Sequence, residues 1–218
     1  MGDFPDILEA GLDVIFIGFN PGLRSGETGH HYAGRNNRFW DLLFESGLTP
    51  GRLTPERDRD LLRHGLGSTN LVRRATPGSG DLSRQELQAG AREILERVTD
   101  LGPRAVCYLG KGVYRAALAA AGDPRPANAP VNYGPCPVRL LPGIIEFVAP
   151  NPSGRSALPW PVKLEWFRRL AEQVRPVSGR LEPTAGRAGR DGDEHENGGR
   201  SDGTAPATPV AGCRRHHP

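Results

Sequence analysis

Along the chain, short apolar runs alternate with segments in which hydrophobic and polar residues have helical periodicity. The first run is the clearest, because Leu12, Val14, Ile15, Phe16 and Ile17 precede a break at Gly18. Apolar runs of this length, rich in β-branched residues and bounded by turn residues, are typical of buried strands. The predicted strands cover 13–18, 67–72, 105–109, 138–141 and 144–148.

The segments between these strands carry helix signals. Ser83 and Glu86 have the spacing of a capping box, and Thr54 stands where an N-cap would stand. The predicted helices cover 37–46, 55–64, 83–99, 111–121 and 163–174. Strands that alternate with helices indicate an α/β fold in three layers, α/β/α, with a central and mostly parallel sheet.

The composition changes close to Pro176. From there to Pro218 the chain has no aromatic residue and few aliphatic ones. Such a segment cannot bury enough apolar area to offset its ordering entropy. We therefore expect a folded domain over 1–175 and a disordered tail over 176–218.

Three polar clusters directly follow predicted strands. Asn20 comes after the first strand, Thr69-Asn70 ends the second, and the segment 151–155 follows the last. In an open α/β sheet, ligands bind at the carboxyl ends of the strands. The clusters therefore predict one pocket, although each cluster alone could be an ordinary turn, because Asn, Pro, Gly and Ser are common turn formers. An amide such as Asn20 donates and accepts hydrogen bonds but does not titrate, so it would orient a reactant.

Charge and cysteine content narrow the picture only slightly. The 28 basic residues outnumber the 25 acidic ones by three, and only Lys111 and Lys163 are lysines. This balance is compatible with nucleic-acid binding without requiring it. The three cysteines have no C-x-x-C spacing, which argues against a zinc or iron–sulfur site. With no signal peptide or membrane-spanning run in the sequence, we expect a cytoplasmic protein that does not bind membranes.

Five motifs follow one another along the chain: Gly18-Phe19-Asn20-Pro21-Gly22, Asn37-Arg38-Phe39-Trp40, Gly67-Ser68-Thr69-Asn70-Leu71-Val72, Leu109-Gly110-Lys111 and Asn151-Pro152-Ser153-Gly154. In this order they resemble the mismatch-specific uracil/thymine-DNA glycosylases, which are the bacterial Mug proteins and their thymine-DNA glycosylase relatives. The resemblance covers 13–174 and implies the fold of the uracil-DNA glycosylase superfamily.

The resemblance implies roles for the residues around the first motif. Asn20 would be the catalytic residue and would position the hydrolytic water, with the backbone of Phe19 close to the base. Tyr32 would stack on a flipped pyrimidine, which needs a π-face as well as edge hydrogen bonds. Ser25 would form the wall close to the pyrimidine C5 position. The alternatives are a turn residue for Asn20 and a half-buried loop tyrosine for Tyr32.

The remaining motifs supply the other implied contacts. Asn70 would bind the pyrimidine edge, at a position where Mug proteins can carry lysine. The loop formed by Asn151, Pro152, Ser153, Gly154 and Arg155 would enter the duplex, with Arg155 in place of an apolar wedge and Ala157 in place of the usual arginine. Lys111, at a predicted helix start, would contact a DNA phosphate. A solvated loop or helix residue is the alternative for both Arg155 and Lys111.

These implications predict a monofunctional DNA glycosylase of base excision repair. It would flip uracil, or thymine or a modified pyrimidine, out of a mismatch with guanine in double-stranded DNA and hydrolyse its glycosidic bond. No metal or cofactor is implied, and we expect a monomer. A second hypothesis is a mismatch-binding module of the same fold that does not cleave. A nucleotide-binding α/β protein is disfavoured, because the chain has no P-loop and no G-x-G-x-x-G fingerprint.

Overall fold

A five-stranded sheet forms the centre of the computed structural model, which describes residues 4–125 and 129–174. The strand order is β2-β1-β3-β5-β4, and β4 alone runs antiparallel to its neighbour. The predicted tail over 176–218 lies outside the described residues. The strands are β1 (Val14–Gly18), β2 (Leu66–Asn70), β3 (Ala105–Leu109), β4 (Gly134–Pro135) and β5 (Ile145–Ala149).

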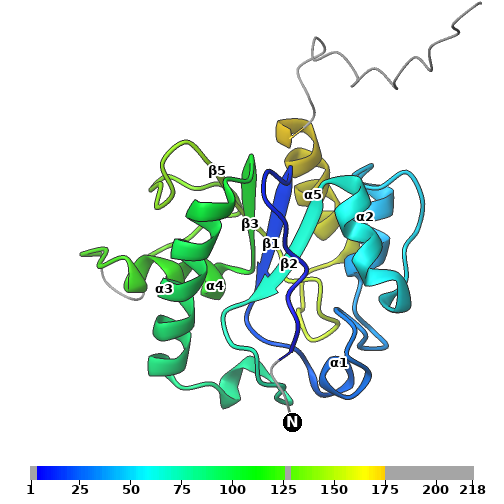
Figure 1. Cartoon of the computed structure of the whole chain (residues 1–218), viewed down its shortest axis with the longest axis horizontal. Helices are drawn as coiled ribbons and strands as arrows, with labels where there is room; N and C mark the ends of the chain where they lie inside the picture. The colour runs from blue at the N-terminus through cyan, green and yellow to red at the C-terminus, as the bar shows by residue number, and fades with distance from the viewer. Residues whose placement is uncertain (1–3, 126–128, 175–218) are drawn as a thin grey trace, which may run out of the picture. The chain divides into compact units, whose positions relative to one another are not determined.

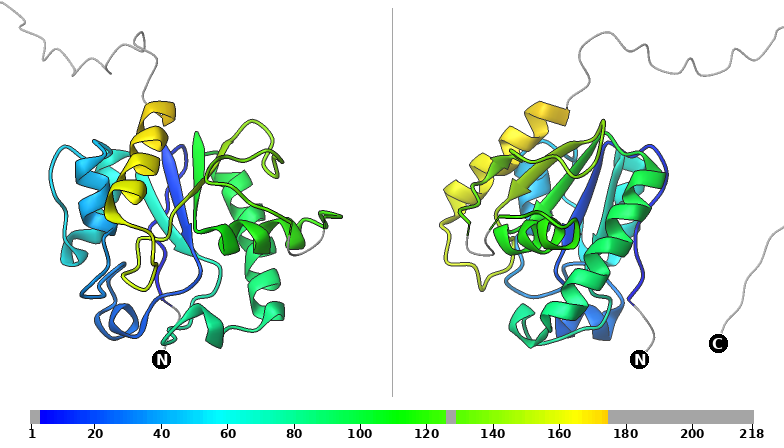
Figure 2. Two further views of the ribbon diagram at one scale, coloured as in Figure 1. Left: turned by 180° about the vertical axis from the view of Figure 1, so that it is seen from behind. Right: turned by 90° about the vertical axis from the view of Figure 1, so that its left-hand side faces the viewer.

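Helices cover both faces of the sheet, which confirms the predicted three-layer fold (Figures 1 and 2). Helices α3 and α4 lie on one face, and α2 and α5 lie on the other. The helices are α1 (Leu23–Thr28), α2 (Phe39–Glu45), α3 (Arg84–Leu101), α4 (Lys111–Ala120) and α5 (Trp160–Val174), with the 3₁₀ helices η1 (Pro55–His64) and η2 (Ser79–Asp81).

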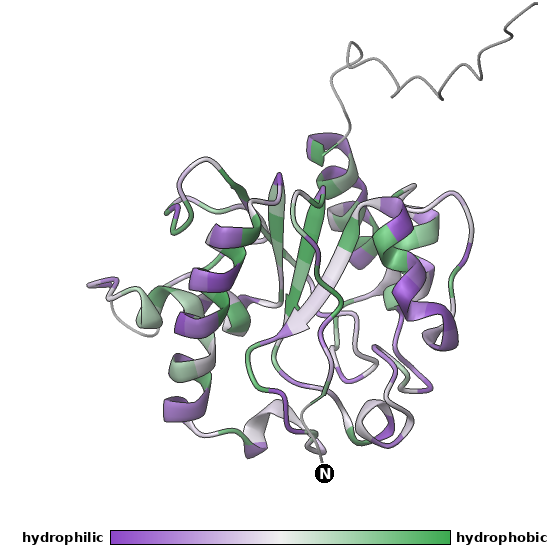
Figure 3. Ribbon diagram, viewed as in Figure 1, coloured by the Kyte–Doolittle hydropathy of each residue, from purple (hydrophilic) through white to green (hydrophobic). Residues whose placement is uncertain are grey.

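The alternation of side chains along β1 divides the core between the two faces. Val14 and Phe16 pack with α2 and α5, whereas Ile15 and Ile17 pack with α3 and α4. Because both faces are covered, every residue of β1 is buried, and the strand is a continuous apolar run. In Figure 3 the hydrophobic colour is strong in β1 and β3, β2 is mostly pale, and the helices around the sheet carry both hydrophobic and hydrophilic colour.

The predicted strand over 138–141 is wrong. The backbone amide of Leu141 donates to the carboxylate of Glu146 at 3.0 Å, and the amide of Leu140 binds the same oxygen. The carbonyl of Val138 accepts from the hydroxyl of Tyr114 at 2.7 Å. Side chains therefore satisfy backbone groups that a strand would use in a ladder. The strand beside β5 is instead β4, which has two residues.

Two helix predictions also need correction, and α1 and the 3₁₀ helix η2 were not predicted. The segment 55–64 is the 3₁₀ helix η1 with a kink at Arg57, and Thr54 makes no side-chain cap hydrogen bond. Helix α5 begins at Trp160, ahead of the predicted start at Lys163. The predicted capping box at the start of α3 is confirmed, because the Ser83 hydroxyl accepts from the Glu86 amide and the Glu86 carboxylate accepts from the Ser83 amide. Helix α1 has six residues and was not predicted.

Parallel pairing brings the ends of the strands to one edge of the sheet. Gly18 pairs with Asn70 across β1 and β2, and Leu109 pairs with Ala149 across β3 and β5. In Figure 1 the arrowhead of β2 points to the end of the molecule where α1 lies. Among the described residues, we find no helix with the length and apolar character needed to cross a membrane.

Helix α3 crosses the end of β2 in very close contact at Gly90. A Cβ added at Gly90 would lie 1.7 Å from the carbonyl oxygen of Leu71, which is backbone and cannot rotate away. We predict that Gly90→Ala lowers the free energy of unfolding by about 1–3 kcal/mol, because the clash outweighs the gain of about 1 kcal/mol in helix propensity. Chemical denaturation measures this.

The matched control is Gly51→Ala, because a Cβ at Gly51 would meet nothing within 4 Å. It should leave the free energy of unfolding within about 0.5 kcal/mol of the wild type. A Gly90→Ala protein as stable as the wild type would show that α3 does not press against Leu71.

Candidate active site

A cavity of about 760 Å³ lies at the edge where the strands end. Its walls come from the segment after β1, the loop after β2 and the loop after β5. The predicted site residues that line it are Phe19, Asn20, Ser25, Tyr32, Asn70, Asn151, Pro152, Ser153, Gly154 and Arg155. The structure thus brings together every predicted site residue except Lys111, which is not among the lining residues.

The amide of Asn20 is held on its nitrogen side. The two N–H groups of Nδ2 are shared among three acceptors, the Pro21 carbonyl at 3.0 Å, the Arg74 carbonyl at 3.2 Å and the Thr76 hydroxyl at 2.7 Å. Carbonyl oxygens only accept, so the atom that faces them must be the donating nitrogen. The carbonyl oxygen Oδ1 accepts no hydrogen bond from the described residues, so it can accept one from a bound molecule.

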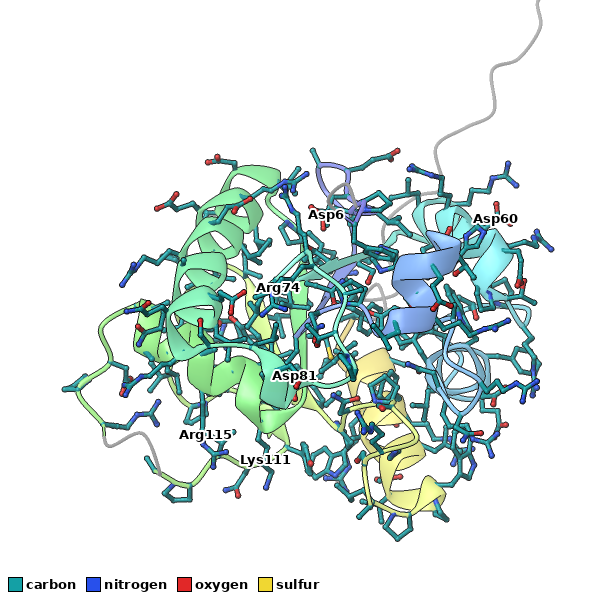
Figure 4. All side chains as sticks on the ribbon, turned by 90° about the horizontal axis from the view of Figure 1, so that it is seen from below. Asp6, Asp60, Arg74, Asp81, Lys111 and Arg115 are labelled. Carbon is teal, nitrogen blue, oxygen red and sulfur yellow. The ribbon has the colours of Figure 1, made fainter. Side chains whose placement is uncertain are left out.

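Thr76 completes this arrangement and was not predicted. Its hydroxyl donates to the Gly78 carbonyl at 2.7 Å, so it must accept from Asn20. Thr76 belongs to no motif in the sequence, and only the path of the loop after β2 brings it to Asn20. Figure 4, which shows the molecule of Figure 1 from below, labels Arg74 and Asp81 of this loop, and the Arg74 guanidinium donates to the Asp81 carbonyl at 2.9 Å. Arg74 also bonds Glu86 at 2.6 Å, which fixes the loop to the start of α3.

Asn70 is buried at the end of β2, with 7% of its surface exposed. Its side-chain amide makes no hydrogen bond with the described residues. A Cβ at Gly18 would lie 2.6 Å from Asn70 Oδ1, so only glycine at this position leaves room for the amide. A nearly buried amide without a protein partner loses hydrogen bonds to water, and a ligand in the cavity can replace them.

The backbone of Tyr32 is left-handed, with φ of 53°, which is uncommon for a residue that has a Cβ. This conformation costs about 1–2 kcal/mol and marks a position that the surrounding structure must hold. One face of its ring stacks on Phe39 with centroids 3.6 Å apart. Ser25 accepts a hydrogen bond from the Ala33 amide at 3.1 Å and so holds the backbone directly after Tyr32. Burial raises the pKa of the Tyr32 hydroxyl, so the ring stays neutral.

Behind Tyr32 lies a chain of buried hydrogen bonds through His31, a residue for which the sequence suggested no role. Nε2 of His31 faces the Pro5 carbonyl at 2.9 Å, so Nε2 carries the proton and Nδ1 accepts. The Ser68 hydroxyl lies 3.0 Å from Nδ1 and therefore donates to it, and accepts from the Tyr32 hydroxyl at 2.7 Å. Burial, with 2% of the residue exposed, lowers the pKa of His31 and keeps it neutral.

The loop after β5 packs against the segment before α2. The Arg38 amide donates to the Pro152 carbonyl at 2.9 Å, and a Cβ at Gly154 would lie 2.7 Å from the Asn36 carbonyl oxygen. Figure 2 shows this loop, in yellow, beside the blue part of the chain that contains α1. Inside the loop, Asn151 Oδ1 accepts from the Ser153 amide at 2.8 Å, which makes a local Asx turn.

Arg155 and Lys163 hold the loop after β5 from its two sides. The guanidinium of Arg155 donates to the Pro77 carbonyl, so it bridges this loop to the loop after β2. The ammonium of Lys163, on α5, donates to the carbonyls of Ser153 at 3.1 Å and Ser156 at 3.4 Å. The loop expected to enter DNA is therefore bonded to the loop after β2 through Arg155 and to α5 through Lys163.

Lys111, labelled in Figure 4, is the first residue of α4 and is not among the residues that line the cavity. Its ammonium sits 4.6 Å from the centre of the Tyr133 ring, which is a cation–π contact. A contact between Lys111 and DNA phosphate stays a prediction.

A second cavity, of about 530 Å³, opens between α3 and α4 and shares only Phe19 with the first. It contains none of the three polar clusters, so we assign the candidate site to the cavity at the strand ends. In residues 4–125 and 129–174 no group of three or more His, Cys, Asp or Glu side chains could hold a metal ion.

The parallel α/β sheet, with an amide-rich cavity at the carboxyl ends of its strands, is the arrangement of an enzyme or ligand-binding protein of the α/β class. A sequence model of the uracil DNA glycosylase superfamily matches residues 5–175. The chain therefore belongs to the uracil DNA glycosylase superfamily, whose members are typically DNA glycosylases, hydrolases that act on DNA in repair.

The protonation of His31 gives a testable dependence of stability on pH. A histidine whose pKa is lowered in the folded state binds more protons when the chain is unfolded. The stabilisation from neutral His31 is therefore complete above the ordinary pKa of 6.5 and decreases as the pH falls below it. We predict that the difference in unfolding free energy between wild type and His31→Gln becomes smaller from about pH 7.5 to about pH 5. Denaturant titrations at several pH values measure this, and a difference that stays constant would contradict it.

Proposed function

We propose that this protein is a monofunctional DNA glycosylase of the Mug and thymine-DNA glycosylase type. Its substrate is uracil, or thymine or a modified pyrimidine, mispaired with guanine in double-stranded DNA. It acts as a cytoplasmic monomer, flips the mispaired nucleotide into the 760 Å³ cavity and hydrolyses the bond between the base and deoxyribose. The observation that carries this proposal is the arrangement of Asn20, whose nitrogen is bonded to the protein and whose carbonyl oxygen is left for a ligand.

In this mechanism, Asn20 orients the attacking water. The water donates a hydrogen bond to Oδ1, which directs an oxygen lone pair to C1′ of the flipped nucleotide. Cleavage develops positive charge on the sugar and negative charge on the departing pyrimidine, so a placed water and fixed dipoles lower the barrier without a strong base. As the C1′–O bond forms and the bond to the base breaks, the proton that the water loses goes to solvent or to the departing pyrimidine anion. Because Asn20 cannot take this proton, we expect a modest rate.

Asn70 and Tyr32 hold the base in this mechanism. The Asn70 amide offers a donor to a pyrimidine carbonyl and an acceptor to the ring N3–H, and its donor also stabilises the leaving anion. Tyr32 offers a ring face whose position is fixed by Phe39 and Ser68. The backbone of Phe19 lies along the base, and Ser25 forms the wall that decides whether a 5-methyl group fits.

An amide can also turn to match cytosine, so Asn70 alone does not exclude a normal base. We infer that discrimination comes mainly from flipping, because a mispaired base costs less energy to unstack than a paired one. Asn151, Pro152, Ser153, Gly154 and Arg155 form the loop that fills the gap. Arg155 must leave the Pro77 carbonyl to reach guanine or phosphate, both of which accept from guanidinium.

The first test is release of uracil from a G·U duplex, measured as alkali-labile abasic sites. We predict that Asn20→Ala lowers the single-turnover rate about 100-fold or more, because the water loses its orienting acceptor. Duplex binding should change little. Undiminished base release by Asn20→Ala would contradict the mechanism. A wild-type protein that binds the mismatch and never releases a base would favour the non-cleaving binding module.

Thr76 gives a second test, because its hydroxyl accepts a hydrogen bond from the Asn20 amide and itself donates to the Gly78 carbonyl. We predict that Thr76→Val lowers the single-turnover rate about tenfold, since the Asn20 amide loses a hydrogen bond that fixes it. Thr76→Ser keeps the hydroxyl and is the matched control, so it should retain most of the rate. The affinity for the duplex should be equal in both variants. Equal rates for Thr76→Val and Thr76→Ser would show that Thr76 does not position Asn20.

A further inference from the structure

A separate basic cavity of about 430 Å³ adjoins the candidate active site behind the loop after β5. The two cavities share Arg35, Asn36 and Gly154. Cationic side chains line the adjoining cavity at Arg35, Arg38 and Lys163, and no carboxylate is among its lining residues. Like charges repel, so three cations around one hollow are a site that an anion would stabilise.

Lys163 is the least expected of these cations, because only 4% of its surface is exposed. A buried ammonium is costly unless it has an anionic partner and hydrogen bonds. It has hydrogen bonds to two loop carbonyls, but in the described part of the chain it has no ion pair. Two of its three N–H donors are used in this way, which leaves one. Burial, followed by the charge of Arg38, lowers the pKa of Lys163.

The two arginines have charge available for a ligand. Arg35 is exposed and makes no ion pair or hydrogen bond with the residues that the structure describes. Arg38 lies 5.6 Å from the Trp160 ring centre and 3.2 Å from Asp41. Asp41 is also paired with Arg52 at 2.8 Å, so its charge is divided between two arginines. The cavity therefore keeps a net positive charge.

We propose that Arg35, Arg38 and Lys163 form a binding site for a phosphate of the DNA backbone. Guanidinium groups match phosphate oxygens in a bidentate geometry, and an ammonium adds a point charge. The bound phosphate supplies the counter-ion that buried Lys163 lacks. Because Lys163 also holds the carbonyls of Ser153 and Ser156, binding of the backbone stabilises the loop in its position over the flipped nucleotide. This proposal rests on the proposed function in one respect, that the ligand is duplex DNA.

The test compares salt dependence of binding to a fluorescent G·U duplex in which a 2′-fluoro substituent on the uridine slows cleavage. Loss of one phosphate contact makes the slope of log K against log [salt] less steep by about 0.9. We expect this change in Arg35→Gln and in Arg38→Gln. The control is Arg52→Gln, which shares Asp41 but does not line the cavity, and should keep the wild-type slope. Equal slopes for all three variants and wild type would overturn the proposal.

A scan with single methylphosphonates, which remove the charge of one phosphate, locates the contact. One backbone position should weaken wild-type binding about tenfold and leave Arg35→Gln and Lys163→Met almost unaffected. If Lys163→Met proves unstable, the comparison of Arg35→Gln with the wild type is sufficient for this test. A scan in which every position affects the variants as much as the wild type would overturn the proposal.

Two further measurements distinguish a DNA phosphate site from a site for free phosphate, and from failure of the proposed function. If 10 mM inorganic phosphate raises the melting temperature of wild type but not of Arg35→Gln, while the DNA slopes are equal, the site binds free phosphate and the DNA assignment is wrong. If no base is released from any mismatch, the proposed function fails. The slopes of log K against log [salt] for wild type and variants, measured on a fully paired duplex, still show whether the phosphate site binds DNA, because backbone contacts do not depend on sequence.

Discussion

The parallel alignment of β1, β2, β3 and β5 is the constraint on which the candidate site depends. It places Gly18 beside Asn70 and Leu109 beside Ala149, so that segments separated by many residues leave the sheet at one edge. The alignment is stable because both faces of the sheet are covered by apolar faces of helices. The sheet therefore supplies rigid positions, and the segments that follow the strands supply the chemistry.

Around this edge, the polar side chains have fixed orientations because one end of each is bonded to the protein. Carbonyl acceptors fix the nitrogen of Asn20, and the Pro5 carbonyl fixes the tautomer of His31 and hence the direction of the bonds to Tyr32. Such preorganisation is what an uncharged catalytic group needs, because its contribution depends on placement and not on proton transfer. The left-handed backbone of Tyr32 fits the same view, since a strained residue persists only where its surroundings hold it.

Much of the fold could be predicted from the sequence. Four of the five strands were predicted, three of them (β1, β3 and β5) from apolar runs, and the Ser83–Glu86 capping box identified the start of α3, because these signals are local. The segment 138–141 was predicted wrongly because its backbone amides bind Glu146, a residue whose orientation no local pattern reveals. Helix α1 is too short, at six residues, to produce a periodic pattern.

The sequence by itself determined four of the five strands, the layers of the fold and the residues of the pocket motifs, because apolar periodicity and turn residues act over short distances. Only the tertiary structure decided which end of the Asn20 amide faces the cavity, through Thr76 and the Arg74 carbonyl. The tertiary structure also decided that Lys163 is buried close to Arg38, behind the loop after β5. The amphipathic pattern of its helix does not reveal this. These contacts join residues far apart in the chain, and their hydrogen bonds and charges have directions that composition and spacing do not contain.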